Sequence, residues 1–146
     1  MTLSIRHLDG ATENLTLMRD EIQVSKDVRF FAQLSREKGR EFAFDFFKDG
    51  HGYALQAQAW VPFVSPERAF ILYTCWELSR LREEPVVLER LDDDEARLRF
   101  TPRAFALYDQ ASHLKQQIHI DDYRRLFETV WLDRAQCAGW DLQISY

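Results

Sequence analysis

Residues 42–60 of this chain read FAFDFFKDGHGYALQAQAW, and the fold class depends on how they pair. Apolar residues alternate before the pair Asp49-Gly50, and a second alternation starts a few residues after it. With Asp49-Gly50 as a two-residue type I′ turn, Phe44 faces Leu55 and the other apolar pairs share that face. The sequence therefore predicts a β-hairpin over residues 42–60.

The same residues also fit a helix that runs from Asp27 to about Lys48, because the aromatic side chains tolerate helical spacing. In the hairpin interpretation the helix is shorter: Ser25 is its N-cap and it ends near Gly39. Before it, residues 12–24 fit either a strand or a helix. Residues 3–7 alternate and predict an edge strand.

The segments after residue 60 are read from their boundaries and their spacing. Ser65 as a cap with Pro66 behind it predicts the start of a helix, and this helix has almost no polar side as far as Leu78. Such a helix needs cover on more than one face, as the centre of the fold or as part of a subunit interface. Residues 86–101 predict a second hairpin around an acidic loop, and a helix follows Pro102.

The C-terminal stretch predicts a helix and then a strand. One helical face carries five apolar residues at three-four spacing: Tyr123, Leu126, Phe127, Val130 and Trp131. Gly139 ends that helix, because glycine takes the left-handed C′ conformation without strain. Residues 140–146 then alternate as a strand with one buried face. We expect one α+β domain over residues 1–146, with an antiparallel sheet built from hairpins 42–60 and 86–101 and strand 140–146, packed with about four helices.

Composition limits the function classes. Hydrophobic residues make up 46% of the chain and aromatic residues 14%, which excludes a disordered protein. The net charge of −5 and the pI near 5.4 argue against nucleic acid and anionic membranes as partners. We expect no signal peptide and no membrane span, and the two distant cysteines match no metal or redox spacing. These features predict a cytoplasmic protein, and the excess of arginine over lysine indicates a GC-rich bacterial genome.

Two clusters suggest metal chemistry, and each has a simpler interpretation. His119 and Asp121 are residue types that suit zinc or iron, but an acid next to a histidine is common where a helix is capped. The acidic run 92–95 lacks the alternating ligands of a calcium loop and reads as a solvated turn. Cys75 lies within a helix and reads as a core residue. The sequence therefore predicts neither a metal nor a cofactor, and it favours no enzyme.

The aromatic residues give two function hypotheses. The first is a small accessory or adaptor protein that binds another protein and forms a homodimer, with Phe47, Trp60 and Phe105 at the interface. The second is a small-molecule-binding protein or an enzyme with an aromatic pocket for an acidic ligand. The predicted pocket residues are Arg97, Arg99, Tyr108, Trp76 and Trp131, with Tyr53 and Tyr73 beside them.

A third hypothesis is an acidic antagonist of a basic partner protein. Glu83, Glu84 and Glu89, together with residues 92–95, supply the acidic patch that this requires. Interspersed arginines weaken it. Arg90, Arg97, Arg99 and Arg103 read either as a stripe for phosphate or carboxylate or as partners in cross-strand ion pairs.

Overall fold

The computed structural model describes residues 12–146, so the strand predicted over residues 3–7 lies outside the described residues. The elements occur in the order α1 (Thr12–Lys38), α2 (Arg40–Phe46), α3 (Gly50–Trp60), α4 (Pro66–Trp76), the π-helical turn η1 (Glu77–Leu81), β1 (Val86–Leu91), β2 (Ala96–Phe100), α5 (Arg103–Gln110), α6 (Ser112–Lys115) and α7 (Ile120–Cys137). The fold is α+β, but it contains more helix and less sheet than the sequence predicts. No helix in the described part of the chain is long and apolar enough to span a membrane.

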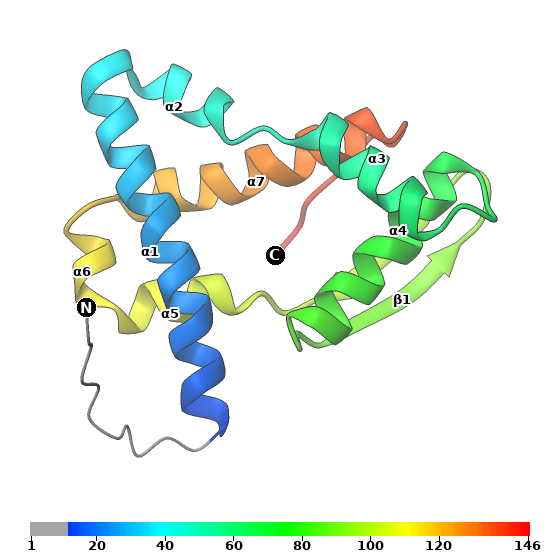
Figure 1. Ribbon diagram of the computed structural model, residues 1–146, viewed down its shortest axis with the longest axis horizontal. Helices are drawn as coiled ribbons and strands as arrows, with labels where there is room; N and C mark the ends of the chain where they lie inside the picture. The colour runs from blue at the N-terminus through cyan, green and yellow to red at the C-terminus, as the bar shows by residue number, and fades with distance from the viewer. Residues whose placement is uncertain (1–11) are drawn as a thin grey trace, which may run out of the picture.

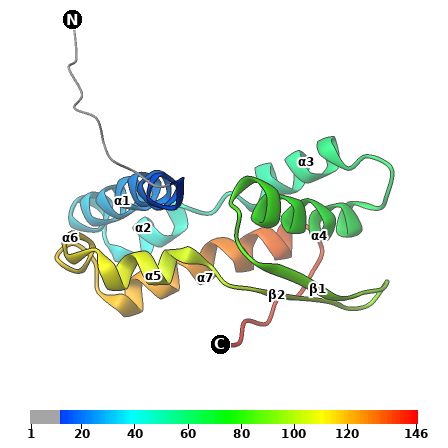
Figure 2. The same ribbon diagram turned by 90° about the horizontal axis from the view of Figure 1, so that it is seen from below.

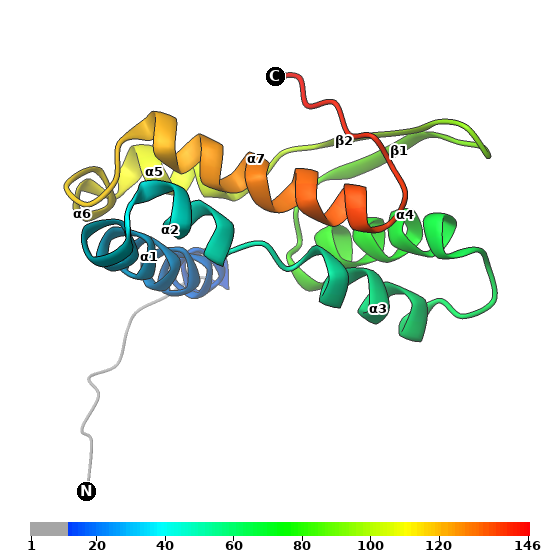
Figure 3. The same cartoon turned by 90° about the horizontal axis from the view of Figure 1, so that it is seen from above.

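Helix α7 joins two groups of elements. Its first half lies beside α1, α2, α5 and α6, and its second half lies beside α3, as Figures 1 and 3 show. In the second group, α4 lies between α3 and the β1–β2 hairpin (Figure 2). The larger predicted sheet is therefore absent from residues 12–146, where the sheet has two strands.

Helix α1 extends well before the predicted start. Ser25 does not cap it but lies inside it, buried. The core stripe of α1 includes Val28 and Phe31, which are 1% and 3% exposed. The helix ends at Gly39, as predicted, because its positive φ of 95° suits glycine.

The hairpin predicted over residues 42–60 is wrong, since α2 and α3 occupy these residues. In α3 the buried positions are Gly50, Tyr53, Ala54 and Ala57, which is helical spacing. Asp49 is the N-cap residue of α3 and not the first residue of a turn. Asp and Gly are common both in hairpin turns and at helix starts, so the sequence signal was ambiguous.

Helix α4 begins as predicted. The Ser65 hydroxyl accepts a hydrogen bond from the Arg68 amide at 3.3 Å, and Pro66 is the first helical residue. The sequence predicts that α4 is covered on more than one face, and α3 and β1 pack against it (Figure 2). Leu78, in the π-helical turn that follows, is 2% exposed.

Strands β1 and β2 lie where the sequence predicts its second hairpin, and they pair antiparallel with Val86 opposite Phe100. The predicted strand 140–146 is wrong, because these residues form no regular structure. Half-buried and exposed residues do alternate from Trp140 to Ser145, as expected for one buried face. The segment pairs with no strand, so the alternation of half-buried and exposed residues reflects its packing against the protein and not a place in a sheet.

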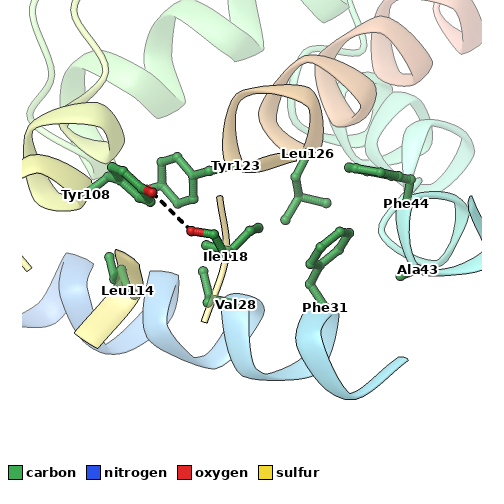
Figure 4. Packing of buried hydrophobic residues seen from close by; sticks show 9 residues of the cluster. All are labelled: Val28, Phe31, Ala43, Phe44, Tyr108, Leu114, Ile118, Tyr123 and Leu126. Atoms are coloured by element: carbon green, nitrogen blue, oxygen red, sulfur yellow. Dashed lines mark hydrogen bonds between the residues drawn. The ribbon is translucent and has the colours of Figure 1, made fainter. Parts of the chain in front are cut away.

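A first cluster of buried side chains fills the space between α1, α2, α5, α6 and the start of α7 (Figure 4). The first cluster consists of Val28, Phe31, Ala43, Phe44, Tyr108, Leu114, Ile118, Tyr123 and Leu126. The Phe31 and Phe44 rings lie 4.8 Å apart. The Tyr108 hydroxyl donates to the Ile118 carbonyl at 3.0 Å, so its burial leaves no unpaired donor.

Candidate functional site

A second cluster holds α3, α4 and the end of α7 together, and half of its buried members are alanine. It consists of Tyr53, Ala54, Ala57, Phe70, Ile71, Tyr73, Ala135 and Ala138. The Gly50 amide donates to the Asp133 carboxylate at 2.7 Å. A Cβ on Gly50 would lie 2.4 Å from the Asp133 carbonyl oxygen, so only glycine permits this approach of α3 to α7.

Large aromatic side chains lie on the surface of this group. Trp60, Phe63 and Trp76 are 66%, 79% and 45% exposed. The Trp60 and Trp76 rings are stacked with centroids 6.3 Å apart, so α3 and α4 contribute to one surface. We call these three residues the aromatic surface.

The segment that carries most of this surface has no charge. Residues 50–66 contain no Asp, Glu, Lys or Arg, whereas charged residues make up 29% of the chain. The exposed side of α3 includes Leu55, Gln56 and Gln58. Aromatic enrichment with depletion of charge distinguishes the centre of a protein interface from ordinary surface.

A polar network lies beneath the aromatic surface. The Tyr53 hydroxyl donates to the Glu77 carboxylate at 2.5 Å and lies 3.3 Å from the Thr74 hydroxyl. Burial raises the pKa of Tyr53, and the Glu77 charge raises it further, so the hydroxyl stays protonated as a donor. Because Tyr53 is 5% exposed, its hydroxyl orders α3 on α4 and is not accessible to a ligand in solution.

Arg134 of α7 completes this arrangement. Its guanidinium lies 4.2 Å from the Tyr53 ring centroid and 4.9 Å from that of Trp131. It also donates two hydrogen bonds to the Asp49 carboxylate, each at 2.7 Å. The sequence interpretation placed Arg97 or Arg99 near these rings and missed Arg134, whose only signal was its place after an aromatic stripe.

The predicted ligand-binding residues do not form one pocket. Tyr108 belongs to the first cluster, whereas Trp131 packs against the second cluster and Trp76 lies on the aromatic surface. Arg97 and Arg99 project from β2 with side chains 63% and 72% exposed, paired with glutamates.

The three predicted interface residues differ in exposure. Trp60 is exposed, but Phe47 is half-buried against the first cluster. Phe105 is also half-buried, with its ring 5.2 Å from the Phe127 ring and 6.0 Å from that of Tyr146. Phe63, the most exposed of the aromatic surface, was not predicted, although its position after Pro62 in an uncharged loop was a signal.

Ion pairs account for the charged hairpin. Arg90 pairs with Asp92 at 2.6 Å and with Glu95 at 2.5 Å, and Arg99 pairs with Glu89 at 3.2 Å. The Asp92 carboxylate also accepts two loop amides, which lower its pKa together with Arg90. Each arginine of the hairpin therefore has an acidic partner and Glu84 is buried, whereas the carboxylates of Asp93 and Asp94 make no ion pair within residues 12–146.

The residues considered for metal or nucleophilic chemistry have structural roles. His119 is the N-cap of α7: its Nδ1 accepts the Asp121 amide at 3.2 Å. Within the described residues no three metal-ligating side chains gather at one point. Burial raises the pKa of the Cys75 thiol, which disfavours the reactive thiolate.

A grouping of Ser25, His113 and Glu21 was not predicted. The Ser25 hydroxyl and the Glu21 carboxylate each lie 3.2 Å from Nε2 of His113. A catalytic triad requires its serine and its acid on different ring nitrogens. Here they share one nitrogen and Ser25 is 6% exposed, so the grouping ties α6 to α1.

Comparison of the chain with protein-family models, with curated proteins and with solved structures finds no match. The function is therefore inferred from the geometry alone.

Proposed function

We propose that this chain is a small accessory or adaptor protein that acts through protein–protein binding and forms a homodimer through the aromatic surface. The observation that carries the proposal is the exposed, stacked pair Trp60 and Trp76 together with the exposed Phe63, and Trp60 and Phe63 belong to the uncharged stretch. Tryptophan is the residue type most enriched among those that dominate binding energy. A two-fold contact of this surface with its own copy pairs apolar side chains with apolar side chains.

The proposal includes a cytoplasmic location. It is supported by the two cysteines, Cys75 and Cys137, which are both free thiols. Structural disulfides are typical of oxidising compartments, and free thiols fit a reducing one.

The test is sedimentation velocity over a range of protein concentrations with two variants. Trp60→Ser removes the α3 ring of the stacked pair, and Ile22→Ser removes a side chain of nearly equal exposure, 67%, on α1. We expect a dimer whose dissociation constant rises about ten-fold or more in Trp60→Ser and stays unchanged in Ile22→Ser.

Two results would contradict the proposal. A protein that is monomeric at every concentration excludes the homodimer. A dimer that Ile22→Ser weakens and Trp60→Ser does not would place the contact on α1, where Leu15, Met18 and Ile22 are also exposed.

A further inference from the structure

A cleft lies in the other half of the molecule, away from the aromatic surface. It has a volume of about 270 Å³, just below the range of roughly 300–1,000 Å³ that is typical of ligand pockets. Its walls are the last turns of α1, the first residue of α2, and the link between α6 and α7. The lining residues are Phe31, Ala32, Ser35, Arg36, Arg40, Gln117, Ile118, His119 and Asp122.

The floor of the cleft is apolar and rigid. Phe31 and Ile118 are 3% and 4% exposed and belong to the first cluster, so the packed core fixes their positions (Figure 4). An apolar floor of this kind favours a ligand with a short apolar body over a free inorganic anion.

The rim carries donors and one unpaired positive charge. Arg40 pairs with Asp122, so those two charges offset each other. Arg36 is exposed and makes no ion pair or side-chain hydrogen bond with any described residue. His119 adds an imidazole to the rim: its Nδ1 faces the Asp121 amide at 3.2 Å and the Asp121 carboxylate at 3.4 Å, which leaves Nε2 as the ring nitrogen for a ligand.

A buried hydroxyl in the wall also lacks a partner. Ser35 Oγ is buried and makes no hydrogen bond, the one such side-chain atom within the described residues. Buried polar side-chain atoms without a partner are rare in native proteins, so the Ser35 hydroxyl is an unusual feature of this wall. Ser35 and Arg36 follow each other at the end of α1, so both border the same cleft.

We propose that this cleft binds a small carboxylic acid with a short apolar body. The body rests on Phe31 and Ile118, and the carboxylate accepts hydrogen bonds from the guanidinium of Arg36, with Nε2 of His119 as the second donor. Arginine is the side chain best suited to this role, because its planar fork matches a carboxylate. The proposal is independent of the aromatic surface and of the homodimer.

The test is a titration of the ¹⁵N-labelled full chain with phenylacetate, followed by amide chemical shifts. Phenylacetamide, a neutral molecule of the same shape, is titrated in parallel. We expect saturable shifts at Ser35, Gln117 and His119 with phenylacetate, and clearly weaker binding of the amide. Arg36→Gln should raise the dissociation constant of phenylacetate about ten-fold, the value of one charge-assisted hydrogen bond.

The matched control is Arg29→Gln. Arg29 is exposed on the same helix, two turns earlier, and does not line the cleft, so its variant should bind phenylacetate like the unchanged chain. Three results would overturn the proposal: no saturable chemical-shift changes, changes only at residues outside the cleft, or an equal loss of phenylacetate affinity in Arg36→Gln and Arg29→Gln. Equal binding of the neutral amide would also overturn it, because the cleft would then select shape and not the carboxylate.

Discussion

The two buried clusters differ in their share of small residues. The first cluster fills its interior with large side chains, of which Phe44 and Leu114 are almost completely buried. The second cluster brings α3 to α7 across Gly50, Ala54 and Ala57, and the two tryptophans on α3 and α4 remain outside. Glycine and alanine let α3 approach α7 closely, while the rings of Tyr53, Phe70 and Tyr73 pack against one another where α3 meets α4. Trp60 and Trp76 lie outside this interior and form the outer surface of the two helices.

The first prediction removes a large side chain from the first cluster. Phe44→Ala deletes a ring that is 1% exposed and contacts the Phe31 ring, so a cavity remains in a rigid setting. We expect the free energy of unfolding to fall by about 3–5 kcal/mol, as for other buried phenylalanines. Urea denaturation followed by circular dichroism measures it.

Phe42→Ala is the control for Phe44→Ala. Phe42 is 49% exposed, and its variant should unfold within about 0.5 kcal/mol of the unchanged chain. In a hairpin over residues 42–60 the two rings would share one buried face. Similar losses in both variants would therefore contradict the helix α2.

The second prediction tests the close approach in the second cluster. In Gly50→Ala the new methyl group meets the Asp133 backbone, which cannot move aside as a flexible side chain can. We expect a loss of about 1–3 kcal/mol in the free energy of unfolding. Thermal and urea unfolding of the same samples measure it.

The matched variant for the second prediction is Gly52→Ala, in the same helix. A Cβ at Gly52 meets nothing within 4 Å, so alanine should stabilise α3 by up to about 1 kcal/mol through its helix propensity. If both variants changed the free energy of unfolding in the same direction, helix propensity, and not contact with α7, would determine the stability of this region.

The sequence identified several elements where a boundary residue and a spacing agreed, but Ser25, which also had both, lies inside α1. Ser65 with Pro66 marked the start of α4, Gly39 marked the end of α1, and the apolar stripe of α7 was predicted correctly. The prediction failed over residues 42–60 because phenylalanine and alanine occupy eight of the nineteen positions and suit both patterns. Alternation and helical spacing then fit equally well, and only tertiary contacts such as Gly50 with Asp133 decide.

The candidate site was less accessible to sequence reasoning than the fold. Trp60 and Trp76 were both selected, but for different roles, because the sequence does not show that their rings stack. The cleft at the end of α1 was not predicted at all. Its walls come from residues 31–40 and 117–122, and nothing local marks segments so far apart as neighbours.

The third prediction concerns the connection between the two groups of elements. The Glu84 carboxylate follows η1 and accepts the Arg103 amide of α5 at 2.9 Å. Burial raises its pKa above the ordinary 4.5, against the opposing effect of the Arg103 hydrogen bond. The folded chain therefore holds this proton more tightly than the unfolded chain. Its contribution to stability is complete below the ordinary value and is lost as pH rises through the raised value.

Glu84→Gln keeps an acceptor for the Arg103 amide and cannot ionise, so it removes this dependence on pH. We expect the stability of the unchanged chain, relative to Glu84→Gln, to decrease as pH rises above the ordinary pKa of 4.5, and we expect this change to be smaller than the Gly50→Ala loss. Urea denaturation of both proteins at each pH measures the difference. If this relative stability increased with pH instead, the hydrogen bond from Arg103, and not burial, would have the larger effect on the Glu84 pKa.

The smallest predicted effect concerns Ser35, in the wall of the cleft. Ser35→Ala deletes a buried hydroxyl without a hydrogen-bond partner and places a better helix former in α1. We expect the free energy of unfolding to rise by about 0.5 kcal/mol in protein without added ligand. Urea denaturation of the variant beside the unchanged chain measures the gain.

Ser79→Ala is the control for Ser35→Ala, because the Ser79 hydroxyl donates to the Cys75 carbonyl at 2.6 Å and its removal should bring no gain. A loss of stability in Ser35→Ala would show that a bound water or ligand already satisfies the Ser35 hydroxyl. Repeating the measurement with phenylacetate separates these two cases. Only a ligand site makes the stability difference between the unchanged chain and the Ser35→Ala variant depend on the concentration of phenylacetate.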